Sequence, residues 1–254
     1  MRSLKPTRFQ KKRKRNHCKI GGIHRGQALG ACLSPAKVSR KLKASQLRRV
    51  YTVLRKTFGH QKWWPGDTPF EVMIGAILTQ NTAWTNVEKA ILNLKNAKKL
   101  SFEALRRVPA KKLSQLIRPA GYFNVKADRL KCFIDFLDRE CQGDLSRLKQ
   151  KTMPELREKL LAVKGVGPET ADSILLYALN KASFVIDAYT KRIFSRHGLA
   201  KDHEGYDRWR EIFTRALPES RDLYNDFHAQ IVRVGKDYCR KVSRCESCPL
   251  QRFF

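Results

Sequence analysis

Apolar residues recur at helical spacing along most of the chain from residue 44 onward. Leu47, Val50, Tyr51, Leu54 and Phe58 are spaced so that they fall on one face of a helix. Further periodic or wholly apolar segments cover residues 70–78, 123–137, 156–163, 171–179, 206–217 and 224–234. No convincing pair of segments alternates between apolar and polar residues, as neighbouring strands would. The pattern therefore predicts an all-α fold.

Residues 1–43 differ in character from the rest of the chain. Up to residue 44 the sequence contains fourteen Lys and Arg residues and no acidic residue, and the first acidic residue is Asp67. The run of five basic residues at 11–15 cannot pack into a core, and several glycines disfavour regular structure. The composition predicts a disordered basic arm that attracts phosphates without sequence preference. A solvated tail without a partner is the alternative.

The whole chain is strongly basic. Its 254 residues carry 53 Lys and Arg against 23 Asp and Glu, which gives a formal net charge of +30. Such an excess repels itself, so it favours a function with a polyanionic partner, and nucleic acid comes before a membrane surface. No apolar run approaches the ~20 residues that span a bilayer. No secretory signal is visible either. We therefore expect no membrane association and an intracellular location, which in a bacterium would be the cytoplasm and nucleoid.

The most informative segment, residues 160–172, has the pattern of a helix, a tight turn and a second helix. Gly165 and Gly167 permit a positive φ and leave the backbone uncovered, and Pro168 suits the first position of the following helix. Free N–H groups at a helix start bind anions, so a DNA phosphate fits this turn. An ordinary hairpin of two helices, with glycines for close packing, is the alternative.

A single carboxylate follows the next apolar run. Phe184, Val185 and Ile186 lead to Asp187, where the pattern predicts a helix start. Aspartate is a favoured N-cap residue, so capping that helix is one role for Asp187. A carboxylate in a groove can also stabilise an oxocarbenium-like sugar and orient a water, as in glycoside cleavage. The two roles are compatible.

These two segments together resemble the helix-hairpin-helix, Gly-Pro and Asp motif of the endonuclease III superfamily, and the resemblance extends over residues 46–250. It implies two helical lobes, one of residues 68–180 and one of residues 44–67 with 181–254, with DNA in the cleft between them. It also implies that Asp187 is the catalytic aspartate. By the same resemblance, the DNA-binding residues are Lys164, Gly165, Val166 and Gly167 in the hairpin, and Gln80 and Asn81 in a loop that fills the gap left by an extruded base. From the residues alone, Gln80 and Asn81 fit a polar helix end and turn equally well.

One departure from the family pattern bears on the chemistry. Bifunctional members have, two residues after the second hairpin glycine, a lysine that attacks C1′ and forms a Schiff base. This chain has Glu169 at that position, and a carboxylate cannot form the imine. Lys164 lies on the other side of the turn. We therefore expect a monofunctional glycosylase that uses water as the nucleophile, with Asp187 and Glu169 as the catalytic residues.

A narrower resemblance points to the bacterial 3-methyladenine DNA glycosylases of the endonuclease III type. It rests on Trp63-Trp64-Pro65 and on residues 78–82, 118–124 and 167–172. Aromatic side chains in that group stack on the extruded base, which implies that Trp63, Trp64 and Pro65 line the base pocket. An electron-rich indole face attracts a cationic alkylated purine. Plain core packing is the alternative for the two tryptophans.

Three of the seven cysteines, Cys239, Cys245 and Cys248, lie close together near the end of the sequence, which is typical of a metal site. Many endonuclease III relatives bind a 4Fe-4S cluster here through four cysteines. This chain has Phe254 where the fourth would fall. Three interpretations stay open: a 4Fe-4S cluster with an irregular fourth ligand, a zinc site that includes another residue such as His228, and a site that holds no metal.

The sequence as a whole predicts a base-excision-repair DNA glycosylase that acts as a monomer on damaged double-stranded DNA and hydrolyses the bond to an alkylated, 3-methyladenine-like base. Two other hypotheses remain. One is a different glycosylase of the superfamily, either a glycosylase and lyase for oxidised pyrimidines or an enzyme for mismatched adenine. The other is a non-catalytic helix-hairpin-helix DNA-binding protein, which would have no chemical need for Asp187.

Overall fold

The computed structural model describes residues 42–253, and every regular element in that range is helical. The helices are α1 (Leu47–Phe58), α2 (Pro69–Leu78), α3 (Trp84–Asn96), α4 (Phe102–Arg107), α5 (Ala110–Leu116), α6 (Phe123–Cys141), α7 (Leu145–Gln150), α8 (Met153–Leu161), α9 (Pro168–Ser173) with its π-helical continuation η4 (Ile174–Ala178), α10 (Ala188–Arg196), α11 (Tyr206–Ala216) and α12 (Arg221–Asp237), with short 3-10 turns η2 (Ala44–Gln46), η3 (Arg118–Ala120) and η5 (Gln251–Phe253). The predicted all-α fold is confirmed for these residues. The predicted arm lies outside them, apart from residues 42 and 43.

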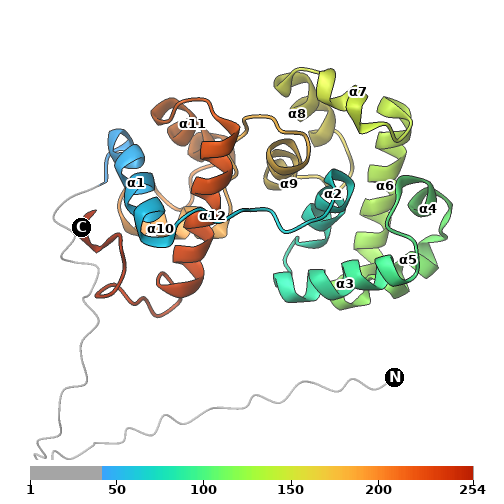
Figure 1. Ribbon diagram of the computed structural model, residues 1–254, viewed down its shortest axis with the longest axis horizontal. Helices are drawn as coiled ribbons and strands as arrows, with labels where there is room; N and C mark the ends of the chain where they lie inside the picture. The colour runs from blue at the N-terminus through green and yellow to red at the C-terminus, as the bar shows by residue number, and fades with distance from the viewer. Residues whose placement is uncertain (1–41, 254) are drawn as a thin grey trace, which may run out of the picture. The chain divides into compact units, whose positions relative to one another are not determined.

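Two hydrophobic cores form within the described range. The first is built by α2 to α9, with Met73, Ile77 and Phe133 fully buried in it. The second is built by α1, α10, α11 and α12 around Trp209 and Phe227. Figure 1 shows α1, α10, α11 and α12 on one side, α2 to α8 on the other, and α9 between them. The lobe boundaries expected at residues 68 and 181 stay a prediction.

The second core extends into residues that the sequence places in the arm. Leu42 is buried in this core, and its backbone N–H donates to the carbonyl oxygen of His197 at 2.9 Å. Packing therefore begins by residue 42, ahead of the predicted boundary at residue 43. In the part of the chain that is described, no helix is both long enough and apolar enough to cross a membrane.

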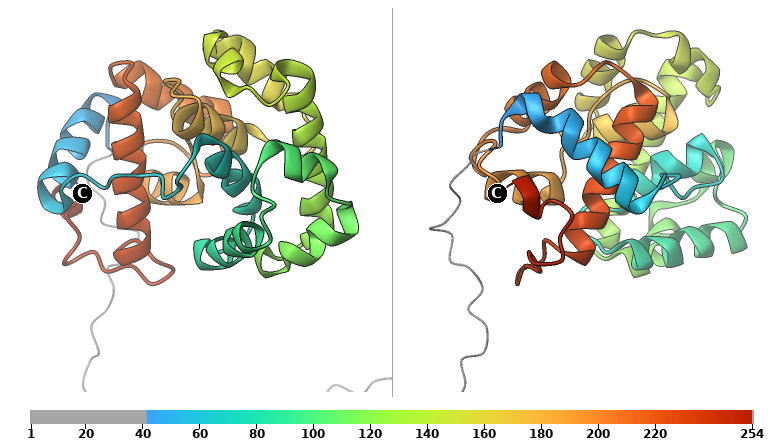
Figure 2. Two further views of the ribbon diagram at one scale, coloured as in Figure 1. Left: turned by 45° about the vertical axis from the view of Figure 1, so that its right-hand side comes forward. Right: turned by 60° about the vertical axis from the view of Figure 1, so that its left-hand side comes forward.

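The segment between α1 and α2, residues 59–68, crosses from one core to the other and contains the two tryptophans (Figure 2). Asp226 of α12 anchors the beginning of this segment. The buried Asp226 carboxylate accepts from the Tyr51 hydroxyl at 3.1 Å and from the Gln61 backbone N–H at 2.9 Å. Thr68 holds its end by capping α2, with its hydroxyl accepting from the Glu71 N–H at 3.1 Å. Trp63 and Trp64 lie between these two anchors.

Helices α8 and α9 form the helix, tight turn and helix that the sequence predicts. Gly165 has a φ of +88°, and a Cβ there would lie 2.3 Å from Cγ of Arg129, so this position requires glycine for both conformation and space. Gly167 is different, because its φ is −90° and an added Cβ would meet nothing within 4 Å. Its backbone is simply uncovered, which suits contact with a partner rather than a tight fold.

Candidate active site

A pocket of about 1010 Å³ lies where helices of the two cores face each other. Of the residues singled out from the sequence, the pocket is lined by Trp63, Trp64, Gln80, Asn81, Gly165, Val166, Gly167, Glu169 and Asp187. Its volume is typical of a site for a small molecule or a single extruded base. Pro65, Lys164 and the three cysteines of the tail do not line it. Pro65 and Lys164 are instead exposed to solvent.

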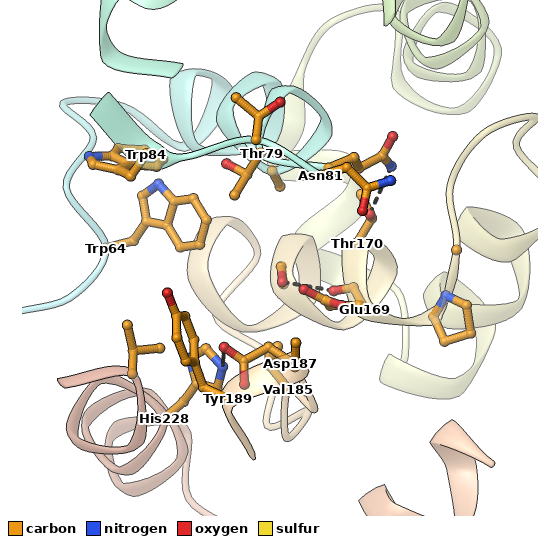
Figure 3. Close-up of a pocket in the computed structure, with 18 of the residues that line it drawn as sticks. Trp64, Thr79, Asn81, Trp84, Glu169, Thr170, Val185, Asp187, Tyr189 and His228 are labelled. Atoms are coloured by element: carbon orange, nitrogen blue, oxygen red, sulfur yellow. Dashed lines mark hydrogen bonds and ion pairs between the residues drawn. The ribbon is translucent and has the colours of Figure 1, made fainter. Parts of the chain in front are cut away.

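Asp187 caps α10 and also faces the pocket (Figure 3). Its Oδ1 accepts from the Thr190 backbone N–H at 2.7 Å and from the Thr190 hydroxyl at 2.8 Å. Its Oδ2 lies 3.5 Å from Nε2 of His228, and only 13% of its side chain is exposed. Burial by itself would raise the pKa of Asp187, but the His228 imidazole and the Thr190 donors outweigh burial and lower it. The carboxylate is therefore ionised at neutral pH, with one oxygen used by the cap and the other directed into the pocket.

Glu169 occupies the first turn of α9, beside Asp187 in the same pocket. Water can reach its carboxyl group, yet protein surrounds it closely enough that desolvation, together with the negative charge of Asp187, raises its pKa to about 7. His228 and Lys191 oppose that rise. Near neutral pH, Glu169 is therefore protonated in a large share of molecules, and the two acidic side chains are not both charged in those molecules.

Aromatic rings form one wall of the pocket. The Trp64 ring is perpendicular to that of Trp84 at a centroid distance of 5.1 Å, and it lies 5.0 Å from the ring of Tyr177. The Trp63 ring packs edge-on against Trp64 at 5.5 Å. Trp64 also packs against the first core, so this residue both contributes to core packing and lines the pocket. The exposed ring surfaces offer π faces to whatever enters the pocket.

Gln80 links the loop after α2 to the hairpin rather than standing free. Its side-chain amide donates to the Gly165 carbonyl and to the Thr170 hydroxyl, both at 2.9 Å, while the Arg129 guanidinium donates to its Oε1. Asn81, by contrast, is exposed and has a φ of +51°. Asn81 is therefore the better placed of the two to enter a gap in DNA, and Gln80 fixes the position of the loop.

A buried lysine fixes the same loop from beneath. The Lys126 side chain is almost wholly buried, and its ammonium group donates to the carbonyls of Leu78 and Ala120, each at 2.8 Å, and to the Thr82 hydroxyl at 2.7 Å. Burial, followed by the charge of Arg129, lowers its pKa to about 8. All three donors of the ammonium group are satisfied, so Lys126 holds the 79–82 turn and does not face the pocket.

The three cysteines of the tail lie near one another but do not form a recognisable metal site. Burial raises the pKa of Cys248 to about 11, and the neighbouring Cys239 and Cys245 thiols add to the rise. Within residues 42–253, no group of three or more His, Cys, Asp or Glu side chains is arranged to hold a metal. His228 does not join the cysteines, because its ring nitrogens face Tyr177 and Asp187. Three thiols are one short of the set that a 4Fe-4S cluster normally takes, so the donor set does not fit that cluster.

We predict that purified protein lacks a stoichiometric 4Fe-4S cluster, because the described tail offers three thiols and no fourth ligand beside them. Protein purified without oxygen should be colourless and should hold far less than about four iron atoms per chain. Elemental analysis with an acid-labile sulfide assay measures this directly. A brown protein with about four atoms of each per chain would contradict the prediction, and one zinc per chain would identify a different site.

Sequence reasoning missed His228, which lines the pocket, and Tyr177, whose hydroxyl contacts it. Tyr177 lies in η4, and its hydroxyl is 2.6 Å from Nδ1 of His228 in α12. His228 in turn faces Asp187. The apolar pattern correctly places both residues in helices. It does not reveal that η4, the start of α10 and α12 bring these side chains together.

The comparisons with known proteins agree with this architecture. The family model for HhH-GPD superfamily base excision DNA repair proteins matches residues 74–219. A protein of Methanocaldococcus jannaschii, provisionally named as a DNA repair glycosylase, is 47% identical over 213 residues, which is 83% of this chain and 96% of the relative. This chain belongs to the HhH-GPD superfamily of base excision DNA repair proteins.

Two solved structures show the same fold. The Helicobacter pylori 3-methyladenine DNA glycosylase bound to 1,N6-ethenoadenine has a TM-score of 0.66 and 30% identity, and the match covers 77% of this chain and 98% of that one. A non-covalent endonuclease III–DNA complex has a TM-score of 0.72 and 21% identity, and covers 84% of this chain and 95% of the other. The fold is therefore that of the helix-hairpin-helix DNA glycosylases.

Proposed function

We propose that this protein is a monofunctional DNA glycosylase that hydrolyses the N-glycosidic bond of a damaged base extruded from double-stranded DNA into the pocket. One observation carries the proposal: the ionised Asp187 and the partly protonated Glu169 share a pocket with an aromatic wall, and Glu169 stands where bifunctional relatives have a lysine. The enzyme acts as an intracellular monomer in this proposal.

The chemistry follows from the charges in the pocket. As the bond between C1′ and the base breaks, the electron pair leaves with the base and positive charge develops on the sugar. The Asp187 carboxylate stabilises that charge, as a positioned anion does in glycoside cleavage. A water oxygen then bonds to C1′, and the water proton goes to the carboxylate. A cationic alkylated purine leaves as a neutral base, so the overall reaction releases one proton.

The aromatic wall favours a cationic alkylated purine, of the 3-methyladenine kind, as the substrate. Trp63, Trp64 and Trp84 present π faces with two acidic side chains nearby, and such a surface attracts a flat cation. The ligand named with the similar H. pylori structure is also a modified adenine. A panel of duplexes, each with one lesion, assayed for free base tests this choice. Preferred release of an oxidised pyrimidine would instead indicate a glycosylase for oxidised pyrimidines, and preferred release of a mismatched adenine would indicate an adenine-mismatch glycosylase.

We predict that the product is an intact abasic site, because no amine occupies position 169. The strand should break only after alkali or heat, and borohydride should trap no enzyme–DNA adduct. Glu169→Lys should create weak lyase activity, provided that its surroundings keep some of the new amine neutral. In the wild-type protein, Lys236 is the amine best placed to form an adduct, because it lines the pocket. Lys164 is exposed, and Lys181 donates to the Lys149 carbonyl.

A borohydride adduct with the wild-type protein would overturn the monofunctional mechanism, and peptide mapping would show which lysine formed it. Glu169→Gln is the matched control for Glu169→Lys, because it changes the same carboxylate without adding an amine. Failure of every lesion to release a base, with DNA still bound, would favour the non-catalytic DNA-binding protein instead.

We predict that DNA binding weakens steeply with salt, since each neutralised phosphate adds roughly −0.9 to the slope of log K against log salt. Deleting residues 1–41 should flatten this slope without changing the preference for one lesion, because that segment is rich in Lys and Arg and has no acidic residue. The deletion stops before Leu42, which is buried in the second core. Fluorescence anisotropy at several salt concentrations measures both slopes, and equal slopes would show that the segment does not contact DNA.

A further inference from the structure

A chain of three side chains from different helices ends at the pocket. The Tyr177 hydroxyl lies 2.6 Å from Nδ1 of His228, and Nε2 of His228 lies 3.5 Å from Oδ2 of Asp187. His228 is almost fully buried, with 5% of its side chain exposed. Figure 3 shows the His228 ring beside Asp187, among the residues that line the pocket. The arrangement has the order phenol, imidazole and carboxylate.

The phenol decides which ring nitrogen of His228 carries the proton. Burial, with the charge of Asp187 next, raises the pKa of Tyr177 well above its ordinary value, so the phenol keeps its proton. A phenol O–H that donates to Nδ1 leaves the neutral imidazole with its proton on Nε2. That N–H points toward Asp187 and the pocket.

The Nε2 atom has no hydrogen-bond partner within the described part of the protein, although it is buried. Its distance of 3.5 Å from Oδ2 of Asp187 is too long for a good hydrogen bond. A buried donor without a partner is unfavourable, so such a site usually holds a water or a ligand. One water between Nε2–H and Oδ2 can accept from the imidazole and donate to the carboxylate. The donor and acceptor of a bound water are thus already in place.

We propose that Tyr177 and His228 are positioning residues for hydrolysis: Tyr177 fixes the tautomer of His228, and His228 orients both the Asp187 carboxylate and the water that attacks C1′. This inference rests on the proposed glycosylase function. The charge balance of the step is unchanged, because the water proton still goes to Asp187 and the imidazole keeps its own proton throughout.

Three titratable groups lie around His228. Asp187 faces it from the start of α10, Tyr177 from η4, and Glu169 from α9. On its own helix, Asp226 is turned away and binds Tyr51 and Gln61. The rates of the His228 variants are therefore also compared in a Glu169→Gln background, which removes the titration of Glu169.

The test compares variants that keep or remove the Nε2 donor. His228→Gln retains an N–H near the Nε2 position, His228→Phe retains only the ring, and Tyr177→Phe removes the hydroxyl while keeping its packing against Trp64. Single-turnover release of base should fall about 10- to 100-fold in His228→Phe, corresponding to one lost donor to the reacting water, and much less in His228→Gln. Tyr177→Phe should lower the rate in the wild-type background and have no further effect in His228→Gln, which has no tautomer to fix.

Two further readouts separate positioning from a merely structural role. Affinity for an uncleavable lesion duplex should be unchanged in all variants, so the loss appears in the chemical step alone. The double variant is the second readout: Tyr177→Phe should cost nothing further in His228→Gln, whereas two independent structural losses would add. His203→Phe, at an exposed histidine, is the matched control and should behave as wild type.

Wild-type rates in His228→Phe and Tyr177→Phe, with Asp187→Asn inactive, would overturn this inference and leave the proposed function standing. A wild-type rate in Asp187→Asn would instead overturn the proposed function itself. An equal loss in His228→Gln and His228→Phe would also refute the donor role. If His228→Phe fails to fold, His228→Gln and Tyr177→Phe with their double variant still decide the matter, since both replacements conserve most of the packing.

Discussion

Replacing Asp187 with asparagine should slow base excision by about a hundredfold to a thousandfold while leaving the fold and DNA affinity nearly unchanged. A positioned charge of this kind contributes ~3–4 kcal/mol to the transition state. The asparagine carbonyl can still accept from the N–H and hydroxyl of Thr190, so the cap of α10 survives. What is lost is the negative charge facing the pocket. Single-turnover excision and binding to an uncleavable duplex measure the two effects separately.

Asp144 provides a matched control for this experiment. It caps α7 by accepting from the Ser146 N–H at 3.0 Å, but it is far more exposed and does not line the pocket. Asp144→Asn should therefore leave excision at the wild-type rate. If Asp187→Asn also kept near-normal excision, Asp187 would be a cap alone and the catalytic mechanism proposed for it would be wrong.

The helices could be predicted from the sequence because burial follows the helical period. Leu47, Val50 and Leu54 are spaced to share one face, and all three are buried in α1. The turn between α8 and α9 was equally predictable, since Gly165 takes the positive φ expected of glycine there and Pro168 opens the next helix. These signals are local, so a single sequence contains them.

The partners of the pocket residues could not be predicted in the same way. Gln80 has the same polar side chain whether it projects into DNA or binds the hairpin, and only the structure shows its amide on Gly165 and Thr170. The local sequence around His228 is that of an ordinary mixed helix, and the sequence around Tyr177 is that of an ordinary apolar helix. Neither indicates a contact with the pocket. The raised pKa of Glu169 depends first on its burial and then on the charge of Asp187, which belongs to another helix. Such properties arise from tertiary contacts and leave no local pattern.

Removal of the buried carboxylate of Asp172 should destabilise the protein by about 3 kcal/mol or more. Asp172 is fully buried, and it accepts from Nε of Arg157 at 2.9 Å and from the Ser183 hydroxyl at 2.6 Å. Arg157 also reaches Asp207 of α11, at 2.7 Å. The cluster therefore connects the hairpin helices α8 and α9 to α11 and to the segment that leads to Asp187. Asp172→Ala leaves the mostly buried Arg157 without its buried counter-charge and leaves Ser183 without an acceptor.

The loss should appear as a fall in Tm of roughly 6–12 °C, since 1 kcal/mol corresponds to about 2–4 °C for a chain of this size. Asp222→Ala is the matched control, because Asp222 forms an exposed pair with Arg221 that contributes little. Arg157→Met combined with Asp172→Leu should recover part of the stability, as apolar residues often replace a buried ion pair without loss. Calorimetry on the full chain measures all of these variants. Equal Tm values for Asp172→Ala and Asp222→Ala would show that the cluster is not what holds the hairpin to α11, and the approach to Asp187 would then depend on apolar packing alone.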